Sequence, residues 1–435
     1  MLNTAARPFV KLVERFLPDP FIFVLILTAI VLVCAVVFQQ QPVLTALNQW
    51  GDGFWGLLGF SMQMLLVLVS GHMLASTRVV KAALDKIATT ARTPGKAIIL
   101  ITLVSMLASW LNWGFGLVVG ALFAKALARR VDVDYRLLVA SAYSGFLVWH
   151  GGLAGSVPLT IATPGHFTVE QIGVIGTGET LFSAMNLTLL GILLVVLPLV
   201  NRAMLPKQSE SVIVDKTALK EAPVDTSEAQ RPAEKLEKSP LLAMLIGFAG
   251  IAYLINYFVG GGTLNLNIIN FLFLFLAMVL HGTPERLLSS LQQAIQGTTG
   301  IVLQFPFYAG IMAVMVESGL ARDLSQWLIS FATVDTLALW SFISAGLVNM
   351  FVPSGGGQWA VQAPVILPAA MELGTDVSKV AMAVAWGDAW TNLVQPFWAL
   401  PVLAIAGLKA KDMMGFCLVQ LIITGLIIST VLLTF

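Results

Sequence analysis

Long apolar runs separated by short polar stretches occupy most of this 435-residue chain. A helix that crosses a bilayer needs about 20 mostly apolar residues, and many of these runs reach that length. Because lipid leaves no partner for unpaired backbone groups, such runs cross as helices, which predicts an all-α polytopic membrane protein. We predict spanning segments at 20–38, 54–75, 136–163, 180–201, 240–258, 264–281, 298–317, 379–408 and 412–434.

Two further apolar runs are interrupted midway. The run 97–128 is broken by NWGFG (112–116), and 336–370 is broken by VPSGGG (352–357). The remaining arms are shorter than a full crossing, so we predict re-entrant hairpins with these breaks at their tips. Two short crossings in place of each hairpin remain an alternative.

Two of the predicted spans also contain polar breaks. YSGFLVWHGGLAG (143–155) lies within 136–163, and GDAWTNLVQPFW (387–398) lies within 379–408. Backbone freed in this way is tolerated at membrane depth only where protein or water surrounds it. We therefore predict two broken transmembrane helices.

The long polar stretch 202–240 divides the chain. It is rich in Pro, Ser, Glu and Lys, which is typical of a mobile cytoplasmic linker. The order of full span, interrupted segment, broken span and full span recurs in the membrane halves 1–201 and 241–435. With 240–258 as an extra helix, the halves are predicted to be inverted repeats.

Composition supports a membrane protein and narrows its function. Hydrophobic residues make up 57% of the chain and charged residues 11%, whereas a soluble domain carries about 25% charged residues. The net charge of +1 says nothing about nucleic acid, but no basic patch with interleaved aromatic residues appears, so no nucleic-acid partner is expected. Cys34 and Cys417 lie within apolar runs as packing residues. No HExxH, GxSxG or P-loop motif indicates an enzyme, and no cofactor is indicated.

Positive charges fix the expected orientation. Lys and Arg accumulate in cytoplasmic loops. With a cytoplasmic N-terminus, only Arg322 and Lys379 of the 24 basic residues fall outside. The pattern predicts a periplasmic C-terminus.

The breaks supply the candidate binding residues. A glycine-rich tip exposes N–H groups at the start of a helix, where a carboxylate is favoured. No Lys or Arg lies deep in any predicted span, so neutral donors would bind a small organic anion weakly and reversibly. The candidate substrate-binding residues are Asn112, Gly114, Gly116, Ser354, Gly355, Gly356, Thr391 and Asn392.

Two ionisable residues within the breaks are candidates for ion coupling. Asp388 is a candidate cation ligand or proton carrier, because an intramembrane carboxylate needs a partner or a proton. The alternative is a structural hydrogen-bond acceptor that caps the broken helix. A histidine side chain changes charge near neutral pH in ordinary surroundings, so His150 could bind substrate or carry a proton. It could equally be a satisfied structural histidine.

Several motifs carry a family resemblance that runs nearly end to end. LPDPFIFVLILT, WGDGFW, NWGFGLVVGA, FVPSGGGQW and QPFWALPVLAIAGL resemble the bacterial short-chain fatty acid transporter family. The resemblance implies secondary active transport of butyrate- and acetoacetate-like monocarboxylates across the bacterial inner membrane. An anion channel, or a carrier of another small organic anion such as a dicarboxylate, is the alternative.

This family resembles a distant member of the ion-transporter superfamily. That likeness implies inverted repeats, paired re-entrant hairpins, an elevator motion and a homodimer. Sodium-coupled dicarboxylate carriers of the superfamily place Ser-Asn-Thr at their hairpin tips, whereas this chain has Asn112-Trp-Gly and Pro353-Ser-Gly. The coupling ion, H+ or Na+, therefore stays open.

Overall fold

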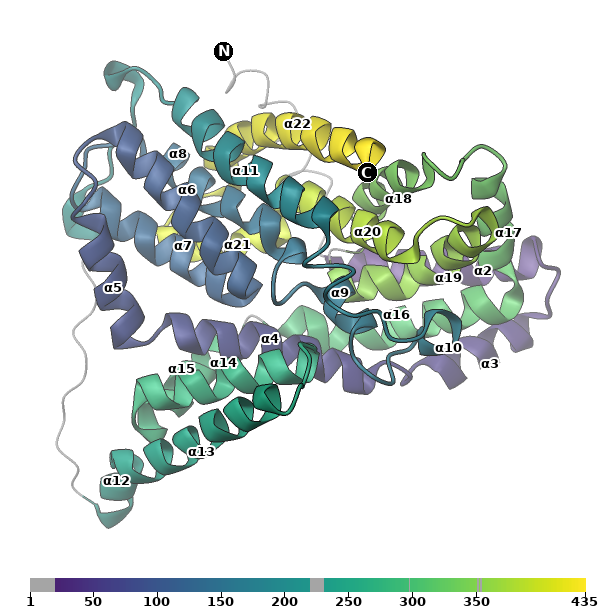
Figure 1. Ribbon diagram of the computed structural model, residues 1–435, viewed down its shortest axis with the longest axis horizontal. Coiled ribbons are helices and arrows are strands. Elements are labelled where there is room, and N and C mark those ends of the chain that lie inside the picture. Colours follow the sequence, from purple (N-terminus) through teal and green to yellow (C-terminus); the bar gives the residue numbers. More distant parts are fainter. Residues whose placement is uncertain (1–19, 220–230, 297, 350–351, 353) are drawn as a thin grey trace.

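The computed structural model describes residues 20–219, 231–296, 298–349, 352 and 354–435, and this part of the chain contains helices and no strand (Figure 1). Arg7, Lys11, Arg15 and Pro353, which entered the charge pattern and the second tip, lie outside the described residues. The expected all-α class is confirmed.

The first half contains spans, short surface helices and one broken segment. Its elements are α2 (Pro20–Val37), α3 (Val43–Gly53), α4 (Leu58–Ala75), α5 (Arg78–Ala88), α6 (Pro94–Leu111), α7 (Trp113–Ala128), α8 (Tyr135–Ser144), η1 (Gly145–Gly151), α9 (Ser156–Ile161), α10 (Val169–Ile172) and α11 (Ala184–Ala203).

The second half follows the polar stretch and one extra helix. The elements of the polar stretch are η2 (Gln208–Glu210), η3 (Lys216–Leu219) and α12 (Pro232–Glu237), and the extra helix is α13 (Pro240–Val259). The second half consists of α14 (Leu266–His281), α15 (Pro284–Ile295), α16 (Thr299–Ser318), α17 (Leu320–Ile329), α18 (Leu337–Asn349), α19 (Gly355–Leu373), α20 (Val377–Asn392), α21 (Pro396–Ala406) and α22 (Ala410–Thr434).

Each predicted span corresponds to a helix or a broken helix. Within the described residues, six helical segments are long and apolar enough to cross a membrane, or seven if the bent pair α16–α17 counts as one. Among them is α6 with 18 residues, so one arm of the first hairpin is longer than expected. Whether the hairpins re-enter the membrane therefore stays a prediction.

The two halves pack in a reciprocal pattern. Helix α4 packs on α14 while α16 packs on α2, and α3 packs on α16 while α15 packs on α4. Likewise α5 contacts α7 while α17 contacts α19. A two-fold relation between similar units produces paired contacts of this kind. The recurring order of elements in the two halves is therefore matched by the way in which the helices pack.

Both interrupted runs form antiparallel helical hairpins. A Cβ atom on Gly116 of α7 would lie 2.5 Å from Ser109 Cα of α6, so this glycine allows the two arms to approach closely. In the second hairpin, Gln358 Nε2 of α19 donates to the Ala345 carbonyl of α18 at 2.9 Å. In Figure 1 the first hairpin lies to the left and the second to the right, with η1 and α9 leading between them.

The two expected helix breaks are also present. The first broken span passes from α8 through the 3₁₀ turn η1 to α9, and the second passes from α20 to α21. The hydroxyl of Tyr143 donates to the Asn392 carbonyl at 2.5 Å and lies 3.4 Å from the Gln395 carbonyl. A side chain from the first break therefore satisfies backbone freed at the second.

The first part of the polar stretch 202–240 packs against the loop that connects α7 to α8. The backbone N–H of Val212 donates to Asp134 Oδ2 at 2.9 Å, and Lys216 Nζ lies 2.8 Å from Asp132 Oδ1. Residues 220–230 of the predicted mobile linker lie outside the described residues.

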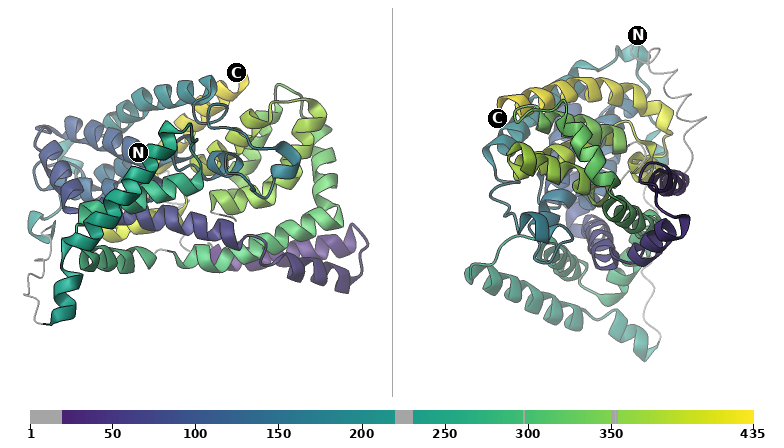
Figure 2. Two further views of the ribbon diagram at one scale, coloured as in Figure 1. Left: turned by 60° about the horizontal axis from the view of Figure 1, so that its bottom comes forward. Right: turned by 90° about the vertical axis from the view of Figure 1, so that its right-hand side faces the viewer.

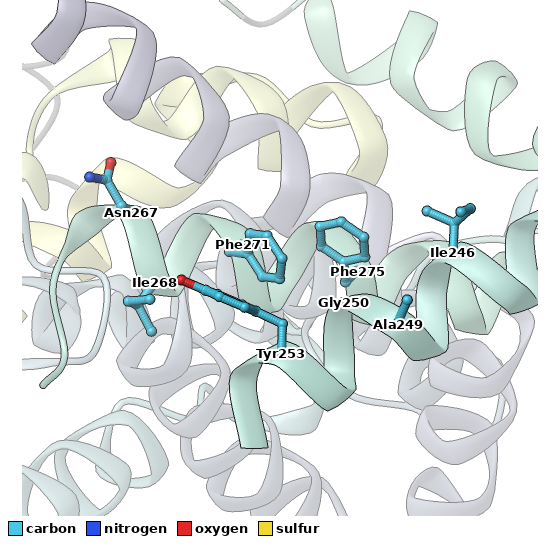
Figure 3. Close-up of a pocket in the computed structure, with 8 residues that line it drawn as sticks. All are labelled: Ile246, Ala249, Gly250, Tyr253, Asn267, Ile268, Phe271 and Phe275. Atoms are coloured by element: carbon cyan, nitrogen blue, oxygen red, sulfur yellow. The ribbon is translucent and has the colours of Figure 1, made fainter. Parts of the chain in front are cut away.

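Helix α13 lies on the outer face of the body, as both views of Figure 2 show. Its side chains are largely exposed and apolar, with Leu241 72% and Val259 83% exposed, which is typical of a lipid-facing helix. A groove of about 450 Å³ between α13 and α14 is lined by Tyr253, Phe271 and Phe275 among others (Figure 3). None of the predicted site residues lines this groove.

Candidate functional site at the hairpin tips

Both hairpin tips rest on the same helix, α4. At the first tip, Asn112 Nδ2 donates to the Val67 carbonyl at 3.1 Å. At the second tip, a Cβ atom on Gly356 would lie 2.5 Å from Phe60 Cζ. Phe60 and Val67 are two turns apart on α4. The two breaks, which are far apart in sequence, are therefore neighbours in space.

An aromatic wall from the first broken span joins the tips. The rings of Trp113 and Trp149 lie 5.8 Å apart, between centroids. Trp149 also contacts the second tip, because a Cβ atom on Gly355 would lie 2.9 Å from Trp149 Cη2. The same Cβ atom would overlap His150 Nε2. Gly355 is required here because any side chain would push the tip away from this wall.

The two polar tip residues have the same local role. Asn112 (φ −160°, ψ 128°) and Ser354 (φ −157°, ψ 108°) are the N-caps of α7 and α19. Asn112 Oδ1 accepts from the Phe115 N–H at 2.9 Å, and Ser354 Oγ accepts from the Gly357 N–H at 3.4 Å. These side chains are engaged by their own helices, so an anion at the tips would meet backbone N–H groups of the first turns.

Gly114 and Gly116 serve close packing. A Cβ atom on Gly114 would lie 2.8 Å from the Leu68 carbonyl oxygen of α4. Gly116 faces Ser109 within the hairpin, as described above. Gly116 therefore supports the shape of the hairpin, while Gly114 seats the tip on α4.

The two predicted coupling residues come together from opposite halves. His150 Nε2 of η1 lies 3.2 Å from Asp388 Oδ2 of α20, and both side chains are fully buried. The two atoms are close enough for an ion pair but are not aligned for a hydrogen bond. Within the described chain, His150 is the ion-pair partner that the structure gives Asp388.

A polar network surrounds Asp388 at the end of α18. Asn349 Nδ2 lies 2.9 Å from Thr391 Oγ1 and 2.7 Å from Asn392 Oδ1, and Asn392 Nδ2 donates to Asp388 Oδ2 at 3.2 Å. Gln395 Nε2 donates to the Asn349 carbonyl. Thr391 and Asn392, predicted as substrate ligands, are thus bound to the network of the second hairpin.

Several buried polar atoms near the tips have no hydrogen-bond partner within the described residues. Such atoms are rare in folded proteins, and each needs an explanation such as a ligand or water. The donors among them include the indole N–H groups of Trp113 and Trp149, and both ring nitrogens of His150 are also unpaired. The acceptors include Asp388 Oδ1, Asn349 Oδ1, Gln395 Oε1 and Gln358 Oε1.

Asn186 holds the two halves of this region together. Its Nδ2 donates to the Gly151 carbonyl at 3.0 Å, and its Oδ1 accepts from Trp386 Nε1 at 3.0 Å. Gly151 follows His150, and Trp386 lies two residues before Asp388. One buried amide therefore fixes the segments that carry both ionisable groups.

The structure brings the predicted residues together around the tips, with Gly116 set back inside its hairpin. Three buried amides of this region are not among the predicted site residues, namely Asn186, Asn349 and Gln395. Each is an amide within an apolar helix or break, and an intramembrane amide is itself a signal of a buried polar contact.

Asn112 offers a graded test of the capped tip. Asn112→Ala removes both the cap and the bond to Val67, so we expect it to lower the free energy of unfolding by about 1–2 kcal/mol. Asn112→Ser keeps a capping hydroxyl, because serine is also a good N-cap. Its free energy of unfolding should therefore lie between those of the wild type and Asn112→Ala. Thermal unfolding of the purified protein in detergent measures the order. Equal stability of all three proteins would contradict the capping role.

The chain has relatives along its whole length. The sequence profile of the family described as "Short chain fatty acid transporter" matches residues 1–435. A protein of Escherichia coli strain K12 named "Putative short-chain fatty acid transporter" is 44% identical over 436 residues, covering 98% of each chain. A Haemophilus influenzae protein of the same name is 42% identical over 437 residues, again with 98% of each chain covered.

Solved transporter structures share the fold. The YdaH transporter of Alcanivorax borkumensis, whose topology is described as unusual, matches with a TM-score of 0.61 and 16% identity over 96% of this chain and 97% of its own. MtrF of Neisseria gonorrhoeae, assigned to a class of antimetabolite efflux pumps, matches with a TM-score of 0.52 and 16% identity over 98% of this chain and 96% of its own. The profile match and the close relatives together show that this chain belongs to the short-chain fatty acid transporter family, a family of multi-pass membrane transporters and not of enzymes.

Proposed function

We propose that this protein is a secondary active carrier that moves short monocarboxylates, of the butyrate and acetoacetate type, across the bacterial inner membrane. The observation that carries the proposal is the meeting of both hairpin tips on α4 and Trp149, beside unpaired buried polar atoms. Family membership and the names of the relatives support the substrate class.

The region between the tips suits a small anion with a short apolar tail. The first turns of α7 and α19 offer backbone N–H groups, and the indole N–H groups of Trp113 and Trp149 lack acceptors. Trp113 also contacts Trp398, with 5.2 Å between ring centroids. Aromatic faces would exclude water from the acyl chain, while neutral donors would allow release. A carboxylate bound here would need no lysine or arginine.

Coupling is assigned to Asp388 and His150. A carboxylate this deeply buried is charged only when a positive partner lies beside it, and otherwise it takes a proton. The His150 imidazole or an added cation would be that partner. Loading the site with H+ or Na+ would thus change how Asp388 is neutralised, which links ion binding to the tips through Trp149.

The membrane arrangement is also part of the proposal. We place the N-terminus in the cytoplasm and the C-terminus in the periplasm, with the repeats inverted and both hairpins re-entrant. The reciprocal packing of the halves supports the repeat relation. The superfamily resemblance supports an elevator motion and a homodimer.

Reconstituted transport tests the proposed function directly. An inward H+ gradient and an inward Na+ gradient are imposed on proteoliposomes in separate experiments. Labelled butyrate or acetoacetate should accumulate with one of them, because a carrier uses the gradient to concentrate its substrate. A C4 dicarboxylate should compete poorly. Uptake that stops when the substrate concentrations inside and outside are equal would indicate a channel. Preferred transport of the dicarboxylate would show that the substrate class is dicarboxylates.

Gly355→Ala tests the second tip. The added methyl would overlap His150, so the tip should shift and uptake should fall by roughly a hundredfold, the scale expected for a misplacement of about 1 Å at a binding site. Gly59→Ala is the matched control, since nothing lies within 4 Å of its Cβ position. Uptake and detergent stability are measured together. Unchanged uptake by Gly355→Ala would remove the second tip from the site.

Asp388→Asn tests the coupling role. The amide keeps the size of the side chain but can neither hold a charge nor release a proton, so gradient-driven accumulation should be lost. Exchange of substrate between equal pools should remain. Asp52→Asn, at an exposed position, is the control. Normal accumulation by Asp388→Asn would leave Asp388 with a structural capping role.

A further inference from the structure

The unpaired acceptors at the end of α18 form a group of their own. Asp388 Oδ1, Asn349 Oδ1 and Gln395 Oε1 have no partner in the described structure, and their side chains are 1%, 0% and 3% exposed. The three residues belong to one hydrogen-bonded network. Asn349 Nδ2 donates to the main-chain carbonyl of Asp388, and Gln395 Nε2 donates to the main-chain carbonyl of Asn349. Buried oxygen atoms left in this way need an explanation, such as a bound ion or water.

The orientation of each amide follows from its other end. Asn349 Nδ2 lies 2.8 Å from the Asp388 carbonyl, and within hydrogen-bond distance of Thr391 Oγ1 and Asn392 Oδ1. Turning this amide over would place an oxygen against the two acceptor-only oxygens, those of the Asp388 carbonyl and Asn392 Oδ1. Gln395 Nε2 is held likewise by the Asn349 carbonyl. The nitrogen ends are therefore anchored, and the oxygen ends are left free.

The two carboxylate oxygens of Asp388 also differ in their contacts. Its Oδ2 accepts from Asn392 Nδ2 and lies beside His150 Nε2, each at 3.2 Å. Its Oδ1 has no partner. Every free atom of the group is thus an acceptor, and one of them belongs to the group's single carboxylate.

We propose that Asp388, Asn349 and Gln395 bind a sodium ion through these three oxygen atoms. Hard cations prefer carboxylate and carbonyl oxygen ligands. The described residues contain no group of three or more His, Cys, Asp or Glu that could hold a metal ion. One carboxylate with two neutral amides therefore suits a monovalent cation. This inference rests on the proposed coupling role of Asp388 and selects Na+ over H+ as the coupling ion.

The site also explains the position of the substrate donors. The unpaired indole N–H groups of Trp113 and Trp149 are reached from Asp388 through His150, which contacts Trp149 with 3.6 Å between ring centroids. In this chain of contacts the two unpaired indole N–H groups lie on one side of His150, and the unpaired oxygen atoms of the group lie on the other. Both ring nitrogens of His150 are themselves unpaired within the described residues. An anion and a cation bound at these two places would attract each other.

Sodium binding is measured without any carboxylate substrate. The purified full-length protein in detergent is heated at constant ionic strength while NaCl replaces choline chloride. We expect the unfolding midpoint to rise saturably with Na+, because a ligand of the folded state stabilises it, and K+ to act more weakly. Gln395→Met should raise the half-saturating Na+ concentration by at least about tenfold, the lower end of losses seen around metal sites. Asp388→Asn should abolish the response.

Gln420→Met is the matched control. Gln420 Oε1 is also buried without a partner, but Gln420 Nε2 donates to Asn201 Oδ1 at 2.7 Å in a separate network. This variant should keep the Na+ response. A wild-type midpoint that does not respond to Na+ would overturn the sodium site and leave buried water on these oxygens. Na+ binding without monocarboxylate uptake would instead reject the proposed substrate and keep the site, whereas uptake without a Na+ response would do the reverse.

Discussion

Backbone groups freed at a helix break find no water in the interior of a bilayer, so the protein itself must satisfy them. This constraint organises the centre of the molecule. Asn112 and Ser354 cap the helices that leave the two tips, and Tyr143 bonds the carbonyls released between α20 and α21. The caps at the tips are local, whereas the break between α20 and α21 relies on a side chain of the first broken span, so these two breaks must lie near one another. The proposed binding region lies among the same contacts that make the breaks tolerable.

The two halves contribute unlike parts to this region. The first half supplies an aromatic wall with indole donors and His150, whereas the second supplies Asp388 and a cluster of amides. Asn186 joins them through Gly151 and Trp386. A reciprocal arrangement of helices thus surrounds a centre that is chemically asymmetric. That asymmetry would suit the proposed carrier of an anion and a cation, since equal sites would favour two ligands of the same sign.

The apolar runs and their polar breaks could be predicted from the sequence because each involves a local change in composition. The short helices α3, α5, α15 and α17 were missed, since helices of this kind are mixed in composition and do not appear as apolar runs. The capping role of Asn112 also escaped, because a cap is distinguished from a free donor only by backbone angles. Asn349 and Gln395 pair across 46 residues, and no local pattern reveals such a contact. Local sequence signals locate the candidate site, whereas the role of each residue in it depends on tertiary structure.

Electrostatics gives a reason for a cation to accompany the proposed anion. Moving a net charge through a low-dielectric interior is expensive. An anion that entered beside a buried Asp388 carboxylate would add a second negative charge to a region where His150 is the ionisable neighbour that the described residues offer Asp388. If one Na+ enters with each monocarboxylate, the net charge of the region is the same when empty and when loaded, whichever protonation state His150 holds. Empty and loaded forms would then meet similar electrostatic barriers, while a site that held the anion alone would meet a higher one.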